Sequence, residues 1–364
     1  MTIPVHRSAE SDPYERGRAF GCAQAESVAN TVASYEHLFR AAGIAGSEVD
    51  LLAEQTGAVL DRAWPELRRE LAGIADGAGR RELELLAVNA RTEILEGHGG
   101  PECSVVCARD HEAHTILAQN WDYHPSLAES VVVWVVERPG GGWFATMTEA
   151  GLLAKIGLND SRLGVCLNLL TSSADGGEMG VPIHVLLRLV LERCRTVEEA
   201  TALLQRASTS ASSAITVARP SQPGSQAGRA DAVTIELSPG GPSAVRADQA
   251  EAVYVHTNHF LEPPSAGQDT TVDEYPDTVK RLETLTAAAP DDLAAVRASL
   301  ASHDGYPRSV CRHADPEVAE PDRSATLASI VMALDAPSFE IALGAPCSAR
   351  YERVELPAGD PVGV

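Results

Sequence analysis

Aromatic residues and lysines are scarce in this 364-residue chain. Aromatic side chains make up 4% of the sequence, so its core must consist mostly of Leu, Val, Ala and Ile. Lys155 and Lys280 are the only lysines, and the formal net charge is −22. A chain this acidic repels phosphate backbones and anionic lipid surfaces. The composition therefore argues against a nucleic acid or a membrane as partner.

Long apolar runs are also missing. No run approaches the ~20 residues that span a bilayer, and the polar stretch from Met1 to Arg18 lacks the apolar segment of a signal peptide. We therefore expect a cytoplasmic protein. The seven cysteines are scattered and odd in number, which does not fit a disulfide framework, so most are expected to be reduced core residues. They are Cys22, Cys103, Cys107, Cys166, Cys194, Cys311 and Cys347.

The order of patterns along the chain is helices, strands, helices, strands, which indicates one compact α+β unit. Residues from about 22 to 96 have helical periodicity, with a capped helix beginning at Ser47 and a helix stop at Gly79. From Cys103 the pattern changes to short β-rich runs separated by turns. The strands expected there are 104–108, 115–119, 130–137, 143–147, 153–158 and 164–169.

Helical and extended patterns alternate again in the second half. Thr196 is the expected N-cap of one helix. Segments rich in Pro, Ser and Gly predict exposed loops at 219–231 and 261–274. The expected helices are 183–194, 197–207, 275–286 and 291–302. The expected strands are 214–218, 232–237, 252–256, 326–333, 338–343 and 351–355.

Cys103 begins an apolar, β-branched run directly after a Gly-rich turn. A buried structural cysteine is one interpretation, because free Cys often fills cores. The other is a nucleophile that cuts the chain at its own amide. The thiol would attack the upstream carbonyl through a five-membered ring, and water would hydrolyse the resulting thioester. The new α-amine, with an ordinary pKa of about 7.7–8.0, could then act as base for its own thiol.

Motifs spread along the chain favour the second interpretation, because each is weak alone but all occur in one order. They are Arg16-Gly17 with Phe20-Gly21, Trp64-Pro65, Asn89 with Arg91-Thr92-Glu93, Cys103, Gln119-Asn120-Trp121-Asp122, Thr148-Glu149-Ala150-Gly151, Gly180-Val181-Pro182, His256-Thr257-Asn258-His259, Tyr306-Pro307 with Ser309, Cys311 and Arg312, and Ala325-Thr326-Leu327. With these motifs the chain resembles the acyl-coenzyme A:6-aminopenicillanic acid acyltransferase family, whose members are self-processing cysteine enzymes of the N-terminal nucleophile hydrolase superfamily.

The resemblance implies four catalytic residues. Cys103 would be the nucleophile, and Asp122 would hold and polarise its α-amine. Asn258 would donate to the developing oxyanion, and Arg312, in the Ser-x-x-Arg segment that starts at Ser309, would lie close to the thiol. Without the family, each of the last three has a plainer interpretation: a loop-capping Asp, a turn Asn and an ion-paired Arg.

The resemblance also implies residues for self-processing and for the substrate pocket. Ser213 falls where the family has a serine that assists cleavage, although Ser212 beside it fits nearly as well. Glu102 departs from the family, which cleaves after Gly. Gly forms a strained backbone at low cost, so Glu102 could slow maturation, or its carboxylate could assist it. The pocket candidates are Tyr123, Thr148, Glu149 and Ser309, of which Glu149 could instead cap a turn.

Other kinds of site fit the sequence less well. Cys103, Cys107, His111 and His114 have the residue types of a zinc site, but in a strand the two cysteines would be about 13 Å apart. The Gly-x-Ser-x-Gly elbow of an α/β hydrolase and the Gly-rich loops of phosphate sites are missing. We therefore expect no metal and no cofactor.

The resemblance implies a four-layer αββα sandwich made as a precursor. Cleavage would give segments 1–102 and 103–364, which stay interleaved as one unit. The enzyme would form an acyl thioester on Cys103 from a small-molecule amide, with water or an amine as acceptor and a coenzyme A thioester as an alternative acyl donor. The expected partners are the small-molecule substrate and the cleaved fragment, and the sequence leaves open whether the chain also forms a homo-oligomer. The competing hypothesis is a catalytically silent, unprocessed relative that binds a small acyl amide.

Overall fold

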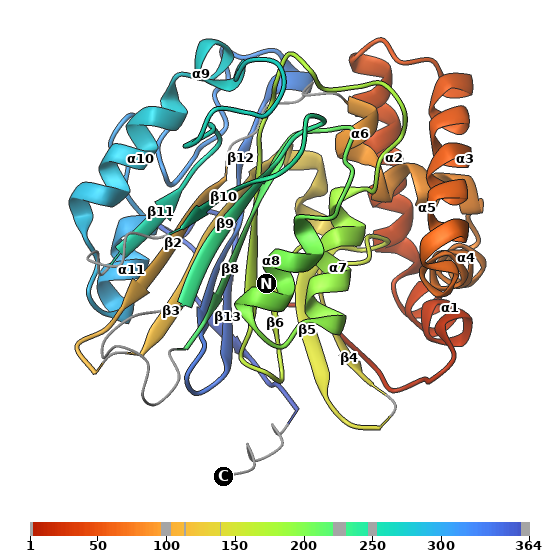
Figure 1. Ribbon diagram of the computed structural model, residues 1–364, viewed down its shortest axis with the longest axis horizontal. Helices are drawn as coiled ribbons and strands as arrows, with labels where there is room; N and C mark the ends of the chain where they lie inside the picture. The colour runs from red at the N-terminus through yellow and green to blue at the C-terminus, as the bar shows by residue number, and fades with distance from the viewer. Residues whose placement is uncertain are drawn as a thin grey trace.

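The computed structural model describes residues 3–95, 103–112, 114–138, 140–220, 231–246 and 253–357. Two β-sheets lie face to face between helices, which gives four layers (Figure 1). This arrangement confirms the αββα sandwich expected from the sequence. The helices are α1 (Pro13–Ala23), α2 (Ala25–Ala41), α3 (Gly46–Ala63), α4 (Pro65–Ala78), α5 (Glu82–Asn89), α6 (Arg91–Leu95), α7 (Ile183–Arg193), α8 (Val197–Leu204), α9 (Thr271–Glu274), α10 (Asp277–Ala288) and α11 (Leu293–Leu300), with 3₁₀ turns η1 (Pro125–Ser130) and η2 (Glu320–Asp322).

The first sheet has eight strands in the order β1-β4-β5-β6-β7-β8-β9-β10, and the second has six in the order β11-β2-β3-β12-β13-β14. All neighbours are antiparallel except β1 and β4, which are parallel. The strands are β1 (Val5–Ser8), β2 (Ser104–Arg109), β3 (Thr115–Tyr123), β4 (Val131–Glu137), β5 (Trp143–Glu149), β6 (Ile156–Asn159), β7 (Gly164–Leu169), β8 (Ser213–Arg219), β9 (Asp231–Leu237), β10 (Ser243–Arg246), β11 (Val253–His256), β12 (Ala325–Ala333), β13 (Ser338–Leu343) and β14 (Glu352–Val354).

The inner strands are buried on both faces. β2 and β3 pack across the interface on β7, while α10 and α11 cover the outer face of the six-stranded sheet. α7 and α8 cover the outer face of the eight-stranded sheet. All nine residues of β3 are buried in consequence. Burial on both faces also explains the continuous apolar run of β4, which does not alternate with polar residues.

The N-terminal helices pack beside the sandwich, on the right in Figure 1, and the segment before them adds β1 to the edge of the eight-stranded sheet. α1 and α4 cross with their backbones in contact. A Cβ at Gly17 would lie 2.1 Å from the carbonyl oxygen of Glu70, and one at Gly73 would lie 2.1 Å from that of Tyr14. Only Gly allows this approach, which accounts for Gly17 in the first of the motifs.

The sequence missed several elements. β1, β10 and the short helix α9 were not expected, and the helical region begins at Pro13 rather than near residue 22. The expected cap at Ser47 is wrong, because α3 begins at Gly46 without a side-chain cap. Thr196 is confirmed as an N-cap, since its hydroxyl accepts from the backbone N–H of Glu199. Most of the expected loop at 219–231 lies outside the described residues.

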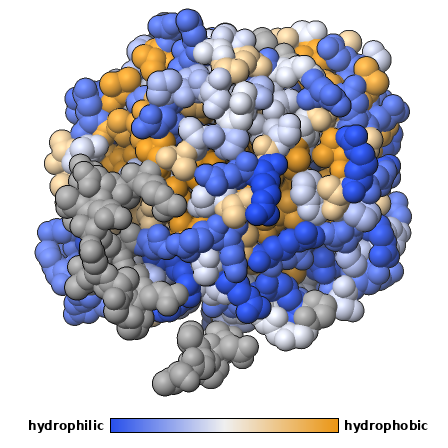
Figure 2. Space-filling model, viewed as in Figure 1, coloured by the Kyte–Doolittle hydropathy of each residue, from blue (hydrophilic) through white to orange (hydrophobic). Residues whose placement is uncertain are grey.

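Polar residues cover most of the face seen in Figure 2, and apolar residues appear between them in smaller patches. Over the described ranges, no helix has both the length and the apolar character that a bilayer crossing requires.

Candidate active site

Cys103 lies immediately before β2, with 5% of its surface exposed. Burial raises the pKa of its thiol to about 11, and the nearby charge of Asp122 raises it further. Hydrogen bonds from the Asp122 backbone and the Gln119 side chain act in the opposite direction. Gln119 is itself fixed, because its side-chain amide bonds both the N–H and the C=O of Leu167 on β7 in the facing sheet. The thiol therefore sits in the seam between the two sheets.

The carbonyl group of Cys103 is held by two side chains from other elements. Nη1 of Arg281, on α10, donates to this oxygen at 2.9 Å, and Nδ2 of Asn168, on β7, donates at 3.0 Å. Asn168 is oriented in turn by His256, whose Nδ1 lies 3.1 Å from its Oδ1. The other ring nitrogen of His256 lies 3.1 Å from a carboxylate oxygen of Glu236. Both sheets thus contribute to the position of Cys103.

Arg281 connects Cys103 to Asn258. Nη2 of Arg281 donates to Oδ1 of Asn258 at 3.1 Å, while Nδ2 of Asn258 donates to the carbonyl oxygen of Leu169 at 2.9 Å. The backbone N–H of Asn258 donates to the Thr278 hydroxyl at 2.8 Å. The amide of Asn258 is therefore fixed at both of its polar atoms, close to the residue that precedes β2.

The same arginine leads on to Arg312 and Asp122. Nε of Arg281 donates to Oδ2 of Asp277 at 3.1 Å, and Arg312 forms an ion pair with that same oxygen. The backbone N–H of Arg312 donates to the Thr326 hydroxyl at 2.9 Å, and this hydroxyl donates to Oδ1 of Asp122 at 2.6 Å. The structure thus joins the four expected catalytic residues through one connected set of buried polar groups, in which Cys103 takes part through its backbone carbonyl.

Asp122 is fully buried at the end of β3, and burial raises the pKa of its carboxyl to about 7. Arg312, Arg281 and the Thr326 hydroxyl pull that pKa down, but they do not cancel the desolvation. Among the described residues, Oδ2 of Asp122 has no hydrogen-bond partner. A buried acceptor oxygen beside the thiol is therefore open to a further donor.

Glu149 does not cap a turn, so that interpretation is wrong. It lies at the end of β5, where one carboxylate oxygen is 2.6 Å from Nζ of Lys155 and the other accepts from the Tyr35 hydroxyl at 2.7 Å. The Lys155 ammonium also lies 3.7 Å from the ring centroid of Trp121. Burial lowers the pKa of Lys155 to about 7, although Glu149 opposes this. The positive charge of Lys155 lowers the pKa of the Cys103 thiol, so this pair faces the same centre.

The other pocket candidates differ in their surroundings. The Tyr123 hydroxyl accepts from Nη1 of Arg91 at 3.0 Å, next to the Glu149 pair. Thr148 is buried inside β5, and the Ser309 hydroxyl donates to the carbonyl oxygen of Cys311. None of the four pocket candidates lines either of the two cavities described below.

The processing candidates can be placed only in part. The Ser213 hydroxyl is buried and has no hydrogen-bond partner among the described residues, whereas the Ser212 hydroxyl is bonded to Asp175. This difference favours Ser213 over Ser212 as the serine whose hydroxyl is available to assist cleavage. Glu102, on the other side of the expected cleavage point, lies outside the described residues.

One cavity adjoins the connected set. It has a volume of about 420 Å³, is mainly polar and reaches Arg312. Its lining consists of Glu274, Tyr275, Arg308, Arg312, His313, Asp315, Val318, Asp322, Arg323 and Ser324.

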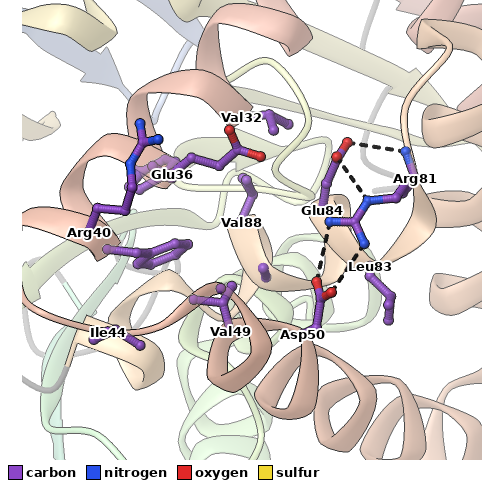
Figure 3. A pocket seen from close by; sticks show the side chains of 14 residues that line it. Val32, Glu36, Arg40, Ile44, Val49, Asp50, Arg81, Leu83, Glu84 and Val88 are labelled. Carbon is purple, nitrogen blue, oxygen red and sulfur yellow. Dashed lines mark hydrogen bonds and ion pairs between the residues drawn. The ribbon is translucent and has the colours of Figure 1, made fainter.

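A second cavity, of about 300 Å³, lies among α2, α3 and α5. Apolar side chains such as Val32, Val49 and Val88 line it, and the paired charges of Asp50, Arg81 and Glu84 lie along one side (Figure 3). Tyr35 lines it too, so its hydroxyl bond to Glu149 connects this cavity to the Lys155 pair.

The zinc ligands considered from the sequence are not gathered together. Cys107 is buried in β2, while the exposed His111 pairs with Asp291 and His114 pairs with Asp110. Within the described part of the chain, the metal-ligand types that do converge are on and near the loop that carries Arg312: His303, Cys311, His313 and Cys347.

Sequence reasoning missed Arg281, Asn168, Asp277 and Lys155. The first three belong to no motif that we recognised, and each reaches the site from an element distant in sequence from Cys103. Lys155 did carry a hint, because it is one of two lysines and lies in an apolar segment that is buried directly before β6.

The four-layer sandwich is the architecture that the family resemblance implied. The chain belongs to the acyl-coenzyme A:6-aminopenicillanic acid acyl-transferase family, whose sequence profile matches residues 108–348. This confirms the family that the motifs indicated, although the matched region begins after Cys103.

A curated relative is the acyl-coenzyme A:6-aminopenicillanic-acid-acyltransferase 40 kDa form of Emericella nidulans. It is 27% identical over 316 residues, which cover 85% of this chain and 84% of the relative. Among solved structures, penicillin V acylase from Agrobacterium tumefaciens has a TM-score of 0.47 at 14% identity, covering 70% of this chain and 86% of its own. A mutant of conjugated bile acid hydrolase from Clostridium perfringens has a TM-score of 0.42 at 11% identity, covering 72% of this chain and 100% of its own.

Proposed function

We propose that the chain is a self-processing cysteine enzyme that cleaves or transfers the acyl group of a small-molecule amide. The observation that carries this proposal is the connected set of buried polar groups that joins the backbone of Cys103 to Asp122, Asn258 and Arg312. Family membership supports acyl transfer or amide hydrolysis as the reaction type.

Maturation would begin with attack by the Cys103 sulfur on the carbonyl carbon of residue 102. The peptide C–N bond breaks as the C–S bond forms, and the amide nitrogen takes up a proton to become the α-amine of Cys103. Water then hydrolyses the thioester and leaves a carboxylate on residue 102. In the uncut chain the thiol pKa of about 11 keeps the sulfur protonated near neutral pH, so a proton acceptor must assist the first step.

After cleavage the α-amine becomes the base. It takes the thiol proton, and the thiolate attacks the amide carbonyl of the substrate. The open Oδ2 of Asp122 is suited to accept a hydrogen bond from this amine. Asn258 would donate to the oxyanion, and the protonated α-amine would return its proton to the departing amine. Water or a second amine then releases the acyl group from sulfur.

The residues around Cys103 also restrict the direction of attack. Arg281 and Asn168 hold its carbonyl oxygen, which limits rotation of the residue that carries both the nucleophile and the base. The polar cavity at Arg312 is lined by three arginines and three carboxylates, so it suits a substrate with polar groups of either sign. The named activity of the Emericella nidulans relative uses coenzyme A thioesters as acyl donors, and the same donor class is proposed here as an alternative to an amide.

The alternative function is an unprocessed relative that binds a small acyl amide without turnover. The departure from Gly at Glu102 favours it.

Intact mass under denaturing conditions tests both functions. Wild type and Cys22→Ser, which changes an exposed cysteine on α1, should give two fragments, the larger beginning at Cys103. Cys103→Ala should remain uncut. The cut protein should then release free amine from a panel of N-acyl amides. An uncut wild-type chain that binds such amides would establish the alternative, and a cut chain in Cys103→Ala would remove Cys103 from the chemistry.

A further inference from the structure

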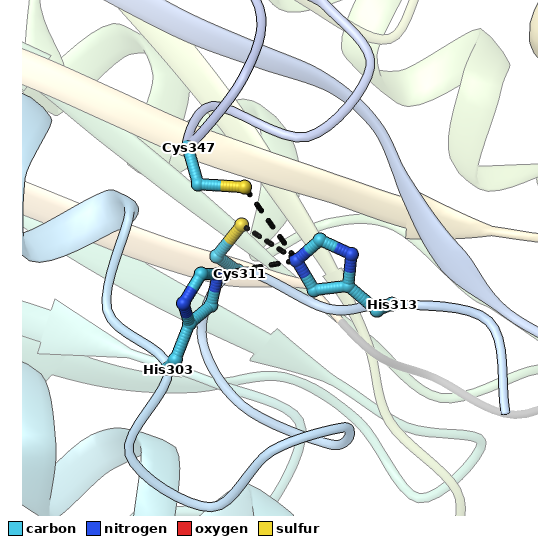
Figure 4. A group of neighbouring side chains, drawn as sticks. All are labelled: His303, Cys311, His313 and Cys347. Carbon is cyan, nitrogen blue, oxygen red and sulfur yellow. Dashed lines mark hydrogen bonds between the residues drawn. The ribbon is translucent and has the colours of Figure 1, made fainter.

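Two histidines and two cysteines converge beside the loop that carries Arg312 (Figure 4). One ligand atom from each of His303, Cys311, His313 and Cys347 lies within 4.8 Å of all the others. His303 and Cys347 are exposed, His313 is half-buried and Cys311 is buried. Figure 4 shows the four side chains pointing toward a common centre from two separate stretches of chain.

The three separations measured from His313 match those of a tetrahedral metal site. Nε2 of His313 lies 3.6 Å from Sγ of Cys311, 3.6 Å from Sγ of Cys347 and 3.1 Å from Nε2 of His303. For Zn–S of about 2.3 Å and Zn–N of about 2.0–2.1 Å, a tetrahedron requires about 3.6 Å between S and N and about 3.3 Å between two N atoms. All three separations therefore lie within about 0.2 Å of those around a zinc ion.

Hydrogen bonding alone leaves this group poorly satisfied. Nε2 of His313 has three neighbours, but a ring nitrogen offers either one hydrogen or one lone pair. At most one of the three contacts can thus be a good hydrogen bond in any tautomer. A metal ion at the common centre would use the lone pairs of all four ligands at once.

The backbone around the ligands is fixed, so the site is preorganised. The N–H of Cys311 donates to the carbonyl oxygen of Ser302 at 3.0 Å, and that of His313 donates to Pro307 at 3.1 Å. The Cys347 turn is closed by a bond from the N–H of Ser348 to Ala345 at 3.1 Å. The ring of Tyr306 lies against both histidine rings, 6.1 Å from His303 and 5.4 Å from His313.

We propose that His303, Cys311, His313 and Cys347 bind one zinc ion. Binding would release the two thiol protons, and two thiolates with two neutral imidazoles would balance the 2+ charge of the ion. Four protein ligands fill the tetrahedron, which is the pattern of a structural rather than a catalytic zinc. The ligand chemistry also disfavours Mg²⁺ and Ca²⁺, which prefer oxygen ligands.

The zinc would pin the loop 302–313 to the turn that follows β13. Arg312 lies between two of the ligands, and its backbone bonds Thr326 while its guanidinium bonds Asp277. The ion would therefore fix the loop that positions Arg312, and His313 would bring it to the edge of the polar cavity. This inference stands apart from the proposed function, because metal content can be measured without any substrate.

The test uses the full chain, purified under reducing conditions from zinc-supplemented cells. Mass-spectrometric metal analysis should find about one zinc per chain in wild type. Cys22→Ser, the matched change at the other exposed cysteine, should keep it. Cys347→Ser and His303→Ala, both at exposed ligands, should lower zinc content at least about tenfold while circular dichroism remains that of the folded chain.

Cobalt provides a second readout. Co²⁺ added to zinc-free wild type should give the visible bands of tetrahedral cobalt and a thiolate-to-cobalt charge-transfer band, both absent in Cys347→Ser. A folded wild-type chain with free thiols that takes up neither metal would overturn the proposal. A disulfide between Cys311 and Cys347 that persists under reductant would overturn it as well, seen as two cysteines that stay protected from alkylation after the protein is denatured with a metal chelator. Zinc retained by both ligand variants would place the metal elsewhere and also refute it.

Discussion

Two buried groups of arginines and carboxylates have similar composition, but they differ in how many carboxylate oxygens are hydrogen-bonded. In the first, Arg16 and Arg188 surround Glu70, at the contact between the N-terminal helices and α7. In the second, Arg281 and Arg312 share Asp277 beside Cys103. In each group, two buried arginines share one carboxylate.

The difference lies in the carboxylate oxygens. Both oxygens of Glu70 accept from both guanidinium groups, at 2.7 to 3.1 Å. Next to Cys103, by contrast, Oδ1 of Asp277 and Oδ2 of Asp122 have no hydrogen-bond partner among the described residues. A group whose acceptors are all used is suited to joining elements, while one with open acceptors is suited to binding a proton or an amine.

The largest effect is expected from Glu70→Ala. Loss of the carboxylate leaves Arg16 and Arg188 buried without their counter-charge, which should lower the free energy of unfolding by about 3–5 kcal/mol. Urea denaturation followed by circular dichroism measures it. The exposed pair of Glu66 and Arg193 provides the control, since Glu66→Ala should cost no more than about 1 kcal/mol. Equal losses of unfolding free energy at the two positions would mean that the group around Glu70 does not hold the N-terminal helices to α7.

Arg281→Lys should affect catalysis more than stability. Lys keeps the charge but cannot hold the Cys103 carbonyl, Asn258 and Asp277 at once, so Cys103, the proposed nucleophile, loses its fixed position. We expect the rate of amine release to fall about 100-fold. Arg297→Lys, on the neighbouring helix α11, should leave that rate unchanged. A normal rate in Arg281→Lys would remove Arg281 from the positioning of Cys103.

Asp122→Asn should change how stability depends on pH. The carboxyl pKa is about 7 in the folded chain and about 3.9 when unfolded, so the folded state holds an extra proton between these values. In wild type, the protonated carboxyl therefore makes its full contribution to stability below about pH 4, and that contribution is lost as the pH rises toward 7. Because Asn does not titrate, the variant should gain stability relative to wild type across that window, by up to about 1.4 kcal/mol per unit of pKa shift.

Unfolding curves at several pH values measure this gain. Asp273→Asn, an exposed change on α9, serves as the control and should show no such trend. A constant difference between wild type and Asp122→Asn would show that Asp122 is already ionised at pH 4.

The smallest effect is expected from Thr326→Val. The hydroxyl accepts from the Arg312 backbone and donates to Asp122, so its loss should cost about 2 kcal/mol. It should also raise the carboxyl pKa further, since the bond to Asp122 favours the ionised form. In a plot of the rate of amine release against pH, the acidic limb should then move to higher pH. Thr216→Val breaks a comparable buried bond, to Thr234, in the other sheet and should leave the profile in place. If the pH dependence shifted in both variants, it would reflect the stability of the fold and not the ionisation of Asp122.

The sequence predicted most inner strands, because strands buried on both faces contain dense apolar runs, as in β2 and β4. It missed β1 and α1, since four residues make a weak strand signal and α1 packs through glycines that carry no apolar pattern. The motifs located Cys103, Asp122, Asn258 and Arg312 in one family, yet their roles stay predictions.

What the sequence could not show is how those residues are joined. Arg281 is 178 positions from the carbonyl group that it binds, and Cys347 is 34 positions from His313. Such contacts depend on which helix covers which sheet and on where a turn ends. Local periodicity contains neither kind of information.

The contact between α1 and α4 also has an evolutionary consequence. At Gly17 and Gly73 even a methyl group would overlap backbone atoms of the opposite helix, and backbone cannot repack as a side chain can. Neither glycine can be replaced even by a similar small residue, and no substitution in a neighbouring side chain can relieve the backbone clash. Among diverging descendants of this chain, these two sites should therefore record descent more faithfully than the apolar core, where volume can be traded between neighbours.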